Sequence, residues 1–540
     1  MSREQTDFDA IGVGAGFAGL ALIHSLREAG QSVRVFDRAS DVGGTWAWNR
    51  YPGAATDSEG YYYCLTFSKE ILDEWSWSER YPGQEETQRY LRFVADKCDL
   101  WPHLQLDTEV VSAHFDAQTG RWQVTTGAGE VFTCKYFISA MGMISHPNVP
   151  QIDGIDAFDG PIFHSSRWPE GLDYAGKRVG IIGSGATTVQ MVPAMAADAA
   201  SVTVFQRTPN FVMPAVQQTM TPEREREIKD NYEAIIDKCR NHVFGMAFDS
   251  PVGRNLADTP PDEVQRIFEE HWPRGSFRWV FETFDDLLSN ADSNQAAADF
   301  INNKIREKVD DPEVAELLMP KGYPLFAKRP PLDHGYFEAF NRDNVHLVDI
   351  KDAEPLKEIT ASGVRTTLQD YDFDIVVLAT GFKAYTGAPE AVDIRGLNGQ
   401  TLKDKWRDES QSIMGVCVSE FPNLFLITGP QAPFANLPTS IEQNVRWITD
   451  CIRKMESENQ DLFLPRREAE DEWSAHTAEI HGQTLMAQGD RVNSWMMGAN
   501  IEGSKPRVLI YFGGANVYYD RLRDSVSEGF PELAFERLAV

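Results

Sequence analysis

Two glycine clusters have the spacing that holds the pyrophosphate of a dinucleotide. They are Gly14-Ala15-Gly16-Phe17-Ala18-Gly19 and Gly183-Ser184-Gly185-Ala186-Thr187-Thr188. In such a motif the first glycine forms a tight turn, the second lets the backbone approach the phosphates, and the third lets a helix pack on a strand. The N–H groups that start this helix then face the negative charge. Thr188 occupies the third glycine position of the second cluster, which leaves the packing of that helix open.

The residues that would meet the ribose differ between the two clusters. Asp37 ends the strand after the first cluster, and a carboxylate there accepts hydrogen bonds from the ribose hydroxyls. Gln206 stands at the matching position after the second cluster, and Arg207 follows it. An arginine binds a 2′-phosphate with charge-assisted hydrogen bonds, which an acid would repel. We therefore expect NADPH at the second site, with a solvated surface arginine as the alternative reading of Arg207. We expect FAD at the first site, because an FAD site usually lies at the chain start, against the first βαβ unit.

Each cluster must sit between two strands and open a helix. Apolar runs at Phe8–Val13 and Val33–Phe36 flank the first cluster, and runs at Arg178–Ile182 and Ser201–Phe205 flank the second. Apolar residues recur at helical spacing after the first cluster. The fold class that we predict is α/β, with two Rossmann-like dinucleotide-binding domains, for FAD and NADP, and a helical insertion.

The insertion is predicted from long helical patterns that begin near Thr221, such as Pro222–Cys239 and Pro261–Trp272. Strands return at Val345–Val348 and Asp374–Leu378. We expect the FAD-binding domain in two parts, 1–145 and 386–540, with a mobile loop near 489–507. The NADP-binding domain is expected at 146–220 and 329–385, with the helical insertion at 221–328.

Composition narrows the classes of partner. The chain has 51 Lys and Arg against 81 Asp and Glu, a net charge of −30 that repels nucleic acid and anionic lipid. We expect neither as a partner, and no protein partner is indicated. Four of the first ten residues are charged, so no signal peptide is expected, and no run of about 18 apolar residues suggests a membrane span. The six cysteines form no CxxC pair, which favours free thiols in the cytoplasm and no metal site.

Two further motifs carry a family resemblance. The run Phe158-Asp159-Gly160-Pro161-Ile162-Phe163-His164-Ser165-Ser166-Arg167-Trp168-Pro169 fits the pattern FxGxxxHxxxWP. Gly43-Gly44-Thr45-Trp46, with Tyr51-Pro52-Gly53 and Asp57, fits GGxWxxxxYPGxxxD. With the glycine clusters, these motifs resemble type I Baeyer–Villiger monooxygenases, such as cyclohexanone and cyclopentanone monooxygenases, over essentially the whole chain.

The resemblance implies an activity and two catalytic residues. The activity is NADPH- and O2-dependent oxidation of aliphatic or cyclic ketones to esters or lactones, through an anionic C4a-peroxyflavin. Arg329 matches the catalytic arginine of the family, and Asp57 matches the carboxylate that positions it. A fixed guanidinium stabilises negative charge on the reacting oxygen atoms.

The motifs and the resemblance also imply which residues meet the cofactors and the substrate. Lys328, Arg207 and Thr208 match the surroundings of the 2′-phosphate, and Trp495 matches a tryptophan on a mobile loop that closes over NADP. His164 matches a linker residue that supports domain movement, although a buried core histidine is an equal reading. The cofactor-binding set is Gly14, Gly16, Phe17, Gly19, Asp37, Arg38, Gly44, Thr45, Trp46, Asp57, Tyr63, Gly183, Ser184, Gly185, Ala186, Thr187, Thr188, Gln190, Arg207, Thr208, Lys328 and Trp495. The expected pocket for the ketone comprises Met143, Phe248, Phe277, Phe434 and Leu437, beside Trp495, although each is also an ordinary core residue.

Three other functions share some of these features. A flavin monooxygenase that oxidises nitrogen or sulfur would have both glycine clusters, but it would need neither Arg329 nor the full FxGxxxHxxxWP motif. A disulfide reductase would need a cysteine pair, which the chain lacks. A flavoprotein scaffold without turnover would have no use for Asp57, Arg329 and Trp495.

Overall fold

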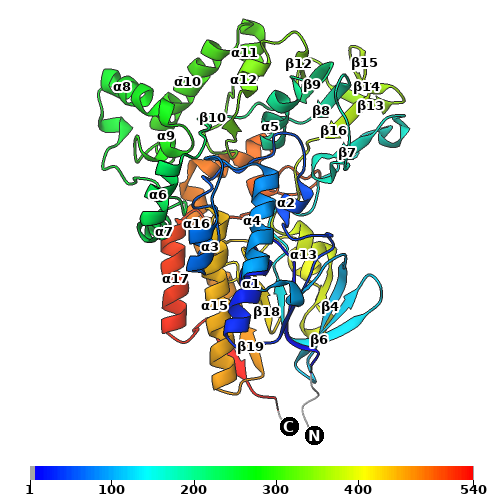
Figure 1. Ribbon diagram of the computed structural model, residues 1–540, viewed down its shortest axis with the longest axis vertical. Coiled ribbons are helices and arrows are strands. Elements are labelled where there is room, and N and C mark those ends of the chain that lie inside the picture. The colour runs from blue at the N-terminus through cyan, green and yellow to red at the C-terminus, as the bar shows by residue number, and fades with distance from the viewer. Residues whose placement is uncertain (1–5, 539–540) are drawn as a thin grey trace.

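The computed structural model describes residues 6–538 and shows a mixed α/β architecture around two large sheets (Figure 1). The segment on which the absence of a signal peptide was predicted therefore lies partly outside the described residues. The predicted α/β class with two nucleotide-type sheets is confirmed.

The first sheet has the strand order β17-β4-β5-β6-β1-β2-β3, and β18 pairs with β6. β1 lies parallel between β2 and β6, so that the start of the chain occupies the middle of the sheet. The predicted strands Phe8–Val13 and Val33–Phe36 have these bounds in the structure. The strands are β1 (Phe8–Val13), β2 (Val33–Phe36), β3 (Leu104–Gln105), β4 (Val110–Asp116), β5 (Arg121–Thr126), β6 (Val131–Ser139), β17 (Asp393–Arg395) and β18 (Leu424–Leu426).

The second sheet is entirely parallel, in the order β12-β9-β8-β16-β7. Its strands are β7 (Ile162–His164), β8 (Arg178–Ile182), β9 (Ser201–Gln206), β12 (Val345–Asp349) and β16 (Ile375–Leu378). Three of these were predicted to within one residue, and β8 has the predicted bounds. The smaller strands are β10 (Met213–Pro214) with β11 (Leu332–Asp333), β13 (Leu356–Thr360) with β14 (Gly363–Thr366) and β15 (Asp370–Asp372), and β19 (Leu462–Pro465) with β20 (Leu533–Glu536).

The helix that follows each glycine cluster packs beside its sheet. α1 (Phe17–Glu28) follows β1, and α5 (Ala186–Met195) follows β8. The long helix α15 (Leu437–Ser457) packs against α1 and also against α17 (Ala515–Ser527) (Figure 1). Other helices are α2 (Thr45–Trp48), α3 (Lys69–Glu74), α4 (Gln84–Lys97), α12 (Tyr336–Ala339), α13 (Gly387–Ala391), α14 (Leu402–Lys405) and α16 (Arg467–Gln483).

The predicted helical region is present, with one difference. The pattern Pro222–Cys239 predicted one helix, whereas the structure has two, which meet at Asn231. The Asn231 side-chain amide donates to the carbonyl of Glu227, and such local bonds compete with a continuous helix. The helices of this region are α6 (Pro222–Asp230), α7 (Tyr232–Asn241), α8 (Pro261–His271), α9 (Arg278–Phe281), α10 (Ala291–Lys308) and α11 (Pro312–Leu318).

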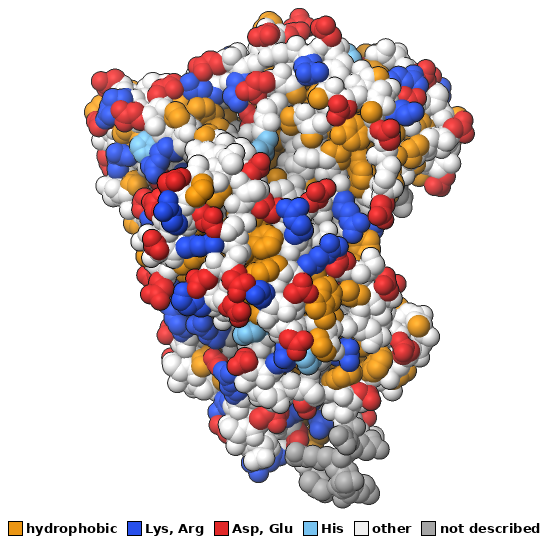
Figure 2. Space-filling model, in the orientation of Figure 1, with side chains coloured by type: hydrophobic (Ala, Val, Ile, Leu, Met, Phe, Trp, Pro, Cys, Tyr) orange, Lys and Arg blue, Asp and Glu red, His pale blue; other side chains and the backbone are white. Residues whose placement is uncertain are grey.

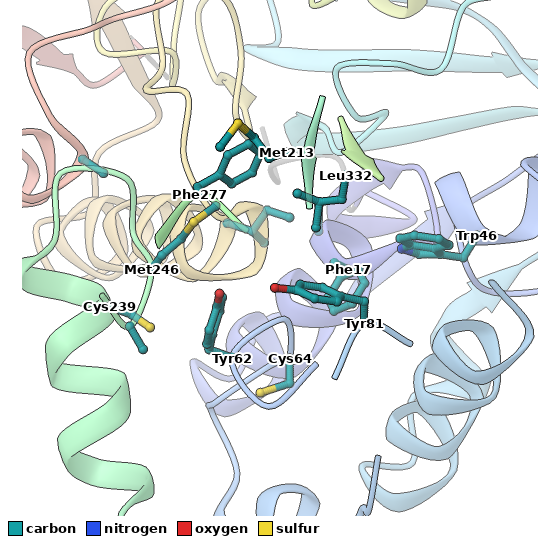
Figure 3. Close-up of a cluster of buried hydrophobic side chains, with 14 of the residues drawn as sticks. Phe17, Trp46, Tyr62, Cys64, Tyr81, Met213, Cys239, Met246, Phe277 and Leu332 are labelled. Atoms are coloured by element: carbon teal, nitrogen blue, oxygen red, sulfur yellow. The ribbon is translucent and has the colours of Figure 1, made fainter. Parts of the chain in front are cut away.

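One hydrophobic core joins the helical region to the N-terminal part of the chain. Figure 3 shows Met246 and Phe277 of the helical region near Tyr62, and Phe17 and Trp46 in the same buried cluster. The shared core holds side chains from segments far apart in the sequence around the cavity described below.

The surface in Figure 2 mixes acidic and basic side chains, with hydrophobic side chains in small groups. Among residues 6–538, no helix has the length and apolar character needed to cross a membrane. All six cysteines are unpaired.

Candidate active site

A cavity of about 930 Å³ is lined by the second glycine cluster, the helical region and the loop around Trp495. Many of the predicted site residues meet there. They are Thr45, Trp46, Asp57, Tyr63, Met143, Gly183, Ser184, Gly185, Ala186, Thr187, Gln190, Phe277, Arg207, Thr208, Lys328, Arg329, Phe434, Leu437 and Trp495. The predicted residues that do not line it are Gly14, Gly16, Phe17, Gly19, Asp37, Arg38, Gly44, Thr188 and Phe248.

The second glycine cluster forms an open cradle at the start of α5. Gly183 has φ +117, and a Cβ there would collide with the carbonyl of Ala379, so that only glycine fits. A Cβ at Gly185 would meet nothing within 4 Å, and no side chain caps α5. The uncapped N–H groups and the open space above Gly185 suit a pyrophosphate.

Thr188 replaces the third glycine without loss of contact between turn and helix. Its hydroxyl donates to the carbonyl of Gly183, at 2.8 Å. The hydrogen bond joins the turn to the first turn of α5, in place of the close backbone approach that glycine permits.

The first glycine cluster is packed against a second pair of glycines. A Cβ on Gly16 would lie 3.3 Å from Cα of Gly44, and a Cβ on Gly44 would lie 3.0 Å from Cα of Gly16. Gly44 has φ +54, which also favours glycine. As at α5, no side chain caps the start of α1. The half-buried backbones at Gly16 and Gly44 therefore approach each other more closely than side chains would allow.

Asp37 is buried and is already hydrogen-bonded by the backbone. Its Oδ2 accepts from the N–H of Ala15 at 2.6 Å, and its Oδ1 accepts from the N–H of Ala39 at 2.8 Å. Burial raises the pKa of this carboxyl, while the two N–H bonds oppose that shift. Asp37 thus shapes the glycine turn, a role that its spacing alone did not indicate. The neighbouring Arg38 guanidinium lies 5.3 Å from the ring centre of Trp48.

Two cations face the cavity beyond the second glycine cluster. Arg207 has no hydrogen bond or ion pair to any residue within 6–538, and Lys328 lies nearby. Burial, together with the charge of Arg207, lowers the pKa of Lys328 to about 8. Gln206 is turned away, because its amide donates to the carbonyl of Leu317 at 2.8 Å. Two adjacent cations without a carboxylate partner favour a bound polyanion.

Arg329 and Asp57 form an ion pair in the wall of the same cavity. The guanidinium Nη1 lies 2.5 Å from Oδ2 of Asp57. Their side chains are 24% and 8% exposed, so that the carboxylate is the deeper of the two. The guanidinium also lies 5.7 Å and 5.9 Å from the ring centres of Phe277 and Phe434. A charged group thereby lies beside two aromatic side chains in the cavity wall.

The apolar wall differs in part from the predicted one. Phe244, Met246 and Phe326 line the cavity and were not predicted, whereas Phe248 does not line it. Phe248 packs instead beneath the guanidinium of Arg278, at 4.7 Å. Gly245, with φ +64, turns the chain between these side chains, and the glycine is the only signal in the sequence that the segment bends there.

Trp495 belongs to a loop of two short 3-10 helices, Leu485–Val492 and Trp495–Met497. Its ring packs against Phe434, with centres 6.1 Å apart. The loop is attached to the segment that follows β16, because the Asn500 amide donates to the carbonyl of Phe382, at 2.9 Å.

His164 lies at the end of β7, away from the cavity wall. Its Nε2 is 2.8 Å from the carbonyl of Gly381, and its Nδ1 is 2.8 Å from the hydroxyl of Ser166. Burial lowers its pKa to about 4, so the ring is neutral at pH 7. Both nitrogens are engaged within the fold, as in a core histidine, and one of them holds the loop after β16.

The relatives found by comparison with known proteins are all named as monooxygenases. Residues 10–236 match the family described as flavin-binding monooxygenase-like. A Baeyer–Villiger monooxygenase of Pseudooceanicola batsensis is 43% identical over 537 residues, 99% of this chain and 97% of that protein. A phenazine N-monooxygenase of Lysobacter antibioticus is 42% identical, over 98% of each. The NADP+-bound crystal structure of a cyclohexanone monooxygenase from Rhodococcus sp. Phi1 superimposes with a TM-score of 0.95 at 40% identity, over 98% of this chain and 99% of that one.

Proposed function

Since the chain belongs to the Baeyer–Villiger monooxygenases, FAD-containing and NADPH-dependent enzymes that convert ketones to esters or lactones, we propose that Arg329 and Asp57 form its catalytic centre. The observation that carries this proposal is their ion pair in the wall of the large cavity, flanked by Phe277 and Phe434. The substrate that we propose is an aliphatic or cyclic ketone.

The residues present fit both cofactors. The uncapped starts of α1 and α5, with Gly16 and Gly185 beside them, suit two pyrophosphates. Arg207 and Lys328 suit the 2′-phosphate of NADP. When bound, FAD activates O2 and NADPH supplies the hydride that reduces the flavin.

The protein would supply a positive charge, position the reacting groups and exclude water. The Arg329 guanidinium would stabilise negative charge on the reacting oxygen atoms, a contribution of roughly 3 kcal/mol for one well-placed donor. Asp57 would hold that guanidinium in place and balance its charge. Phe277, Phe434 and Leu437 would bind the apolar body of the ketone and exclude water.

We also propose the domain division of the chain. The FAD-binding domain would comprise 1–145 and 386–540, because the first sheet draws its strands from both ranges. The NADP-binding domain would comprise 146–220 and 329–385, with 221–328 as the helical insertion. The loop near 489–507 would move over NADP, with Trp495 against Phe434 when closed. The unpaired cysteines favour the cytoplasm as the location.

The phenazine N-monooxygenase relative gives the nitrogen-oxidising alternative a specific basis. Oxidation of an aromatic nitrogen does not build negative charge on a carbonyl oxygen, so it makes less use of Arg329. The test is a panel of cyclic and linear ketones beside aromatic nitrogen heterocycles, with NADPH use and products measured together. Ester or lactone equal to the NADPH consumed supports the proposal. N-oxide from heterocycles, with no product from any ketone, contradicts it.

A further inference from the structure

A second cavity, of about 230 Å³, lies where three helices meet on another part of the molecule. Its walls come from α1, from α15 and from Arg240 at the end of α7, with the segment Thr66–Phe67 beside them. α1 and α15 are in direct contact there, because the hydroxyls of Ser25 and Thr449 are 2.8 Å apart. Figure 1 shows α15 running along α1, while α7 belongs to the helical region. The cavity therefore spans a junction between two parts of the chain.

Three arginines line this small space: Arg240, Arg446 and Arg453. Arg446 and Arg453 lie on one face of α15, since they are seven residues apart. Arg453 is 3.2 Å from Asp450. For Arg240 and Arg446 the structure gives no hydrogen bond and no ion pair within residues 6–538. Most arginines of this range have such a partner, and Arg207, beside the proposed 2′-phosphate position, is another that lacks one.

The carboxylates around the cavity form no hydrogen bond and no close ion pair with these two guanidinium groups within residues 6–538. Glu442 directs both of its oxygens to Thr66, accepting from its backbone N–H and from its hydroxyl. Arg240 and Arg446 act on Glu442 only from beyond ion-pair distance: burial raises the pKa of this carboxyl, and the two positive charges, like the bonds from Thr66, oppose that rise. Glu28 is exposed at the rim. His24 stacks on Phe67, with ring centres 4.0 Å apart, and burial lowers its pKa, which favours the uncharged imidazole on this side of the cavity.

We propose that this cavity binds a phosphate group, free or carried by a small monoester, between Arg240 and Arg446. A phosphate has more acceptor oxygens than one guanidinium can satisfy, and near pH 7 it carries between one and two negative charges. A carboxylate would be saturated by a single arginine fork. The volume lies below the range of about 300–1,000 Å³ that is usual for larger ligands, so the ligand is small.

The test is an isothermal calorimetric titration of the FAD-loaded enzyme with inorganic phosphate, carried out at constant ionic strength. The titration uses an Arg207→Ala background, because Arg207 belongs to the NADP site proposed above. We expect one saturable site. Arg240→Ala and Arg446→Ala should each weaken binding roughly 10- to 150-fold, the effect of losing one charged hydrogen bond. Arg446→Lys, which keeps the charge but loses the fork, should bind with intermediate affinity.

Arg521→Ala is the matched control, because Arg521 on α17 also has no hydrogen bond or ion pair within the described range, yet does not line the cavity. It should bind phosphate as the parent does. Glycerol 3-phosphate distinguishes a monoester from the free ion: tighter binding than inorganic phosphate identifies the monoester as the ligand. The proposal is overturned if the parent shows no saturable binding, if the Arg240 and Arg446 variants bind as it does, or if acetate binds and phosphate does not. Since Arg446 is exposed, its variants should remain folded and yellow, and they decide the outcome if Arg240→Ala is unstable.

Discussion

The guanidinium Nη1 of Arg329 lies 2.5 Å from Oδ2 of Asp57, while Oδ1 of the same carboxylate is buried without a hydrogen-bond partner within residues 6–538. One oxygen therefore holds the arginine and the other remains available. The rings of Phe277 and Phe434 flank the guanidinium but offer no acceptor that would fix its direction. The orientation of Arg329 thus depends on Asp57.

Asp57→Asn should keep the shape of this pair and remove its charge. Because a charged hydrogen bond contributes about 1.5–3 kcal/mol, we expect the yield of ester per NADPH to fall roughly 10-fold or more, with hydrogen peroxide in its place. The control is Asp374→Asn, which breaks an exposed ion pair with Arg178 in the second sheet. If the Asp57→Asn enzyme keeps the parental ester yield, the function of Arg329 does not depend on the charge of Asp57, and the prediction is wrong.

Arg207→Ala should change the choice of coenzyme. On the proposed role of Arg207, the variant would lose one charged contact to the 2′-phosphate, so KM for NADPH should rise roughly 10- to 150-fold, while KM for NADH changes little. Steady-state kinetics with both coenzymes measures the ratio. Equal increases in KM for NADPH and for NADH would show that Arg207 does not bind the 2′-phosphate.

The pH dependence of coenzyme use should follow Lys328. Its pKa in the free enzyme is lowered to about 8, chiefly by burial and further by the charge of Arg207. Lys328 is thus charged below pH 8 and loses its proton above it, so kcat/KM for NADPH should fall as the pH rises through about 8. NADH lacks the 2′-phosphate and should show no such fall. In Arg207→Ala the repulsion is gone, and the midpoint should move to higher pH; an unmoved midpoint would assign it to another group.

The strands that carry the glycine clusters could be predicted closely, because each is a short apolar run bounded by glycine or a charge. Phe8–Val13 and Arg178–Ile182 have their predicted bounds. The helix break at Asn231 could not be predicted, since it depends on a side-chain bond to Glu227 that the apolar pattern does not show.

Site residues that belong to a family motif could be predicted from the sequence, whereas residues that reach the cavity through tertiary packing could not. Asp57 and Arg329 are far apart in the sequence, and the family motifs placed them together. The aromatic wall gave no such signal: Phe244 faces the cavity and Phe248 faces Arg278, although both are ordinary apolar residues of one short segment. The difference comes from the turn at Gly245, whose direction depends on the tertiary fold.

Two glycine variants should separate the two cofactors. Gly185→Val adds a side chain into open space, so the protein should fold, stay yellow and fail to use NADPH, because the branched side chain occupies the phosphate position. Gly16→Val instead pushes against Gly44, and should give colourless or unfolded protein. Flavin absorbance, thermal unfolding and KM for NADPH are the measurements. A Gly185→Val enzyme with parental KM, or a yellow Gly16→Val enzyme with full flavin content, would move the corresponding site elsewhere.

The oxygenase assignment of the site depends most on Arg329. We assign FAD binding to the backbone at Gly16 and Gly44, which the substitution does not change, so Arg329→Ala should purify yellow. The attack on a ketone builds negative charge on oxygen beside Phe277 and Phe434, whose rings offer no hydrogen-bond donor to stabilise it. Loss of the guanidinium should therefore affect oxygen insertion most: Arg329→Ala should oxidise NADPH slowly and release hydrogen peroxide, with at most about 1% of the parental ester. Arg329→Lys keeps a charge but loses the planar fork that meets Asp57, and should be nearly as poor. Ester, peroxide and NADPH are measured in the same reaction, with Arg521→Ala as a surface control. Ester at a near-parental yield from Arg329→Ala would show that this residue does not stabilise the reacting oxygen, and would favour the nitrogen-oxidising alternative.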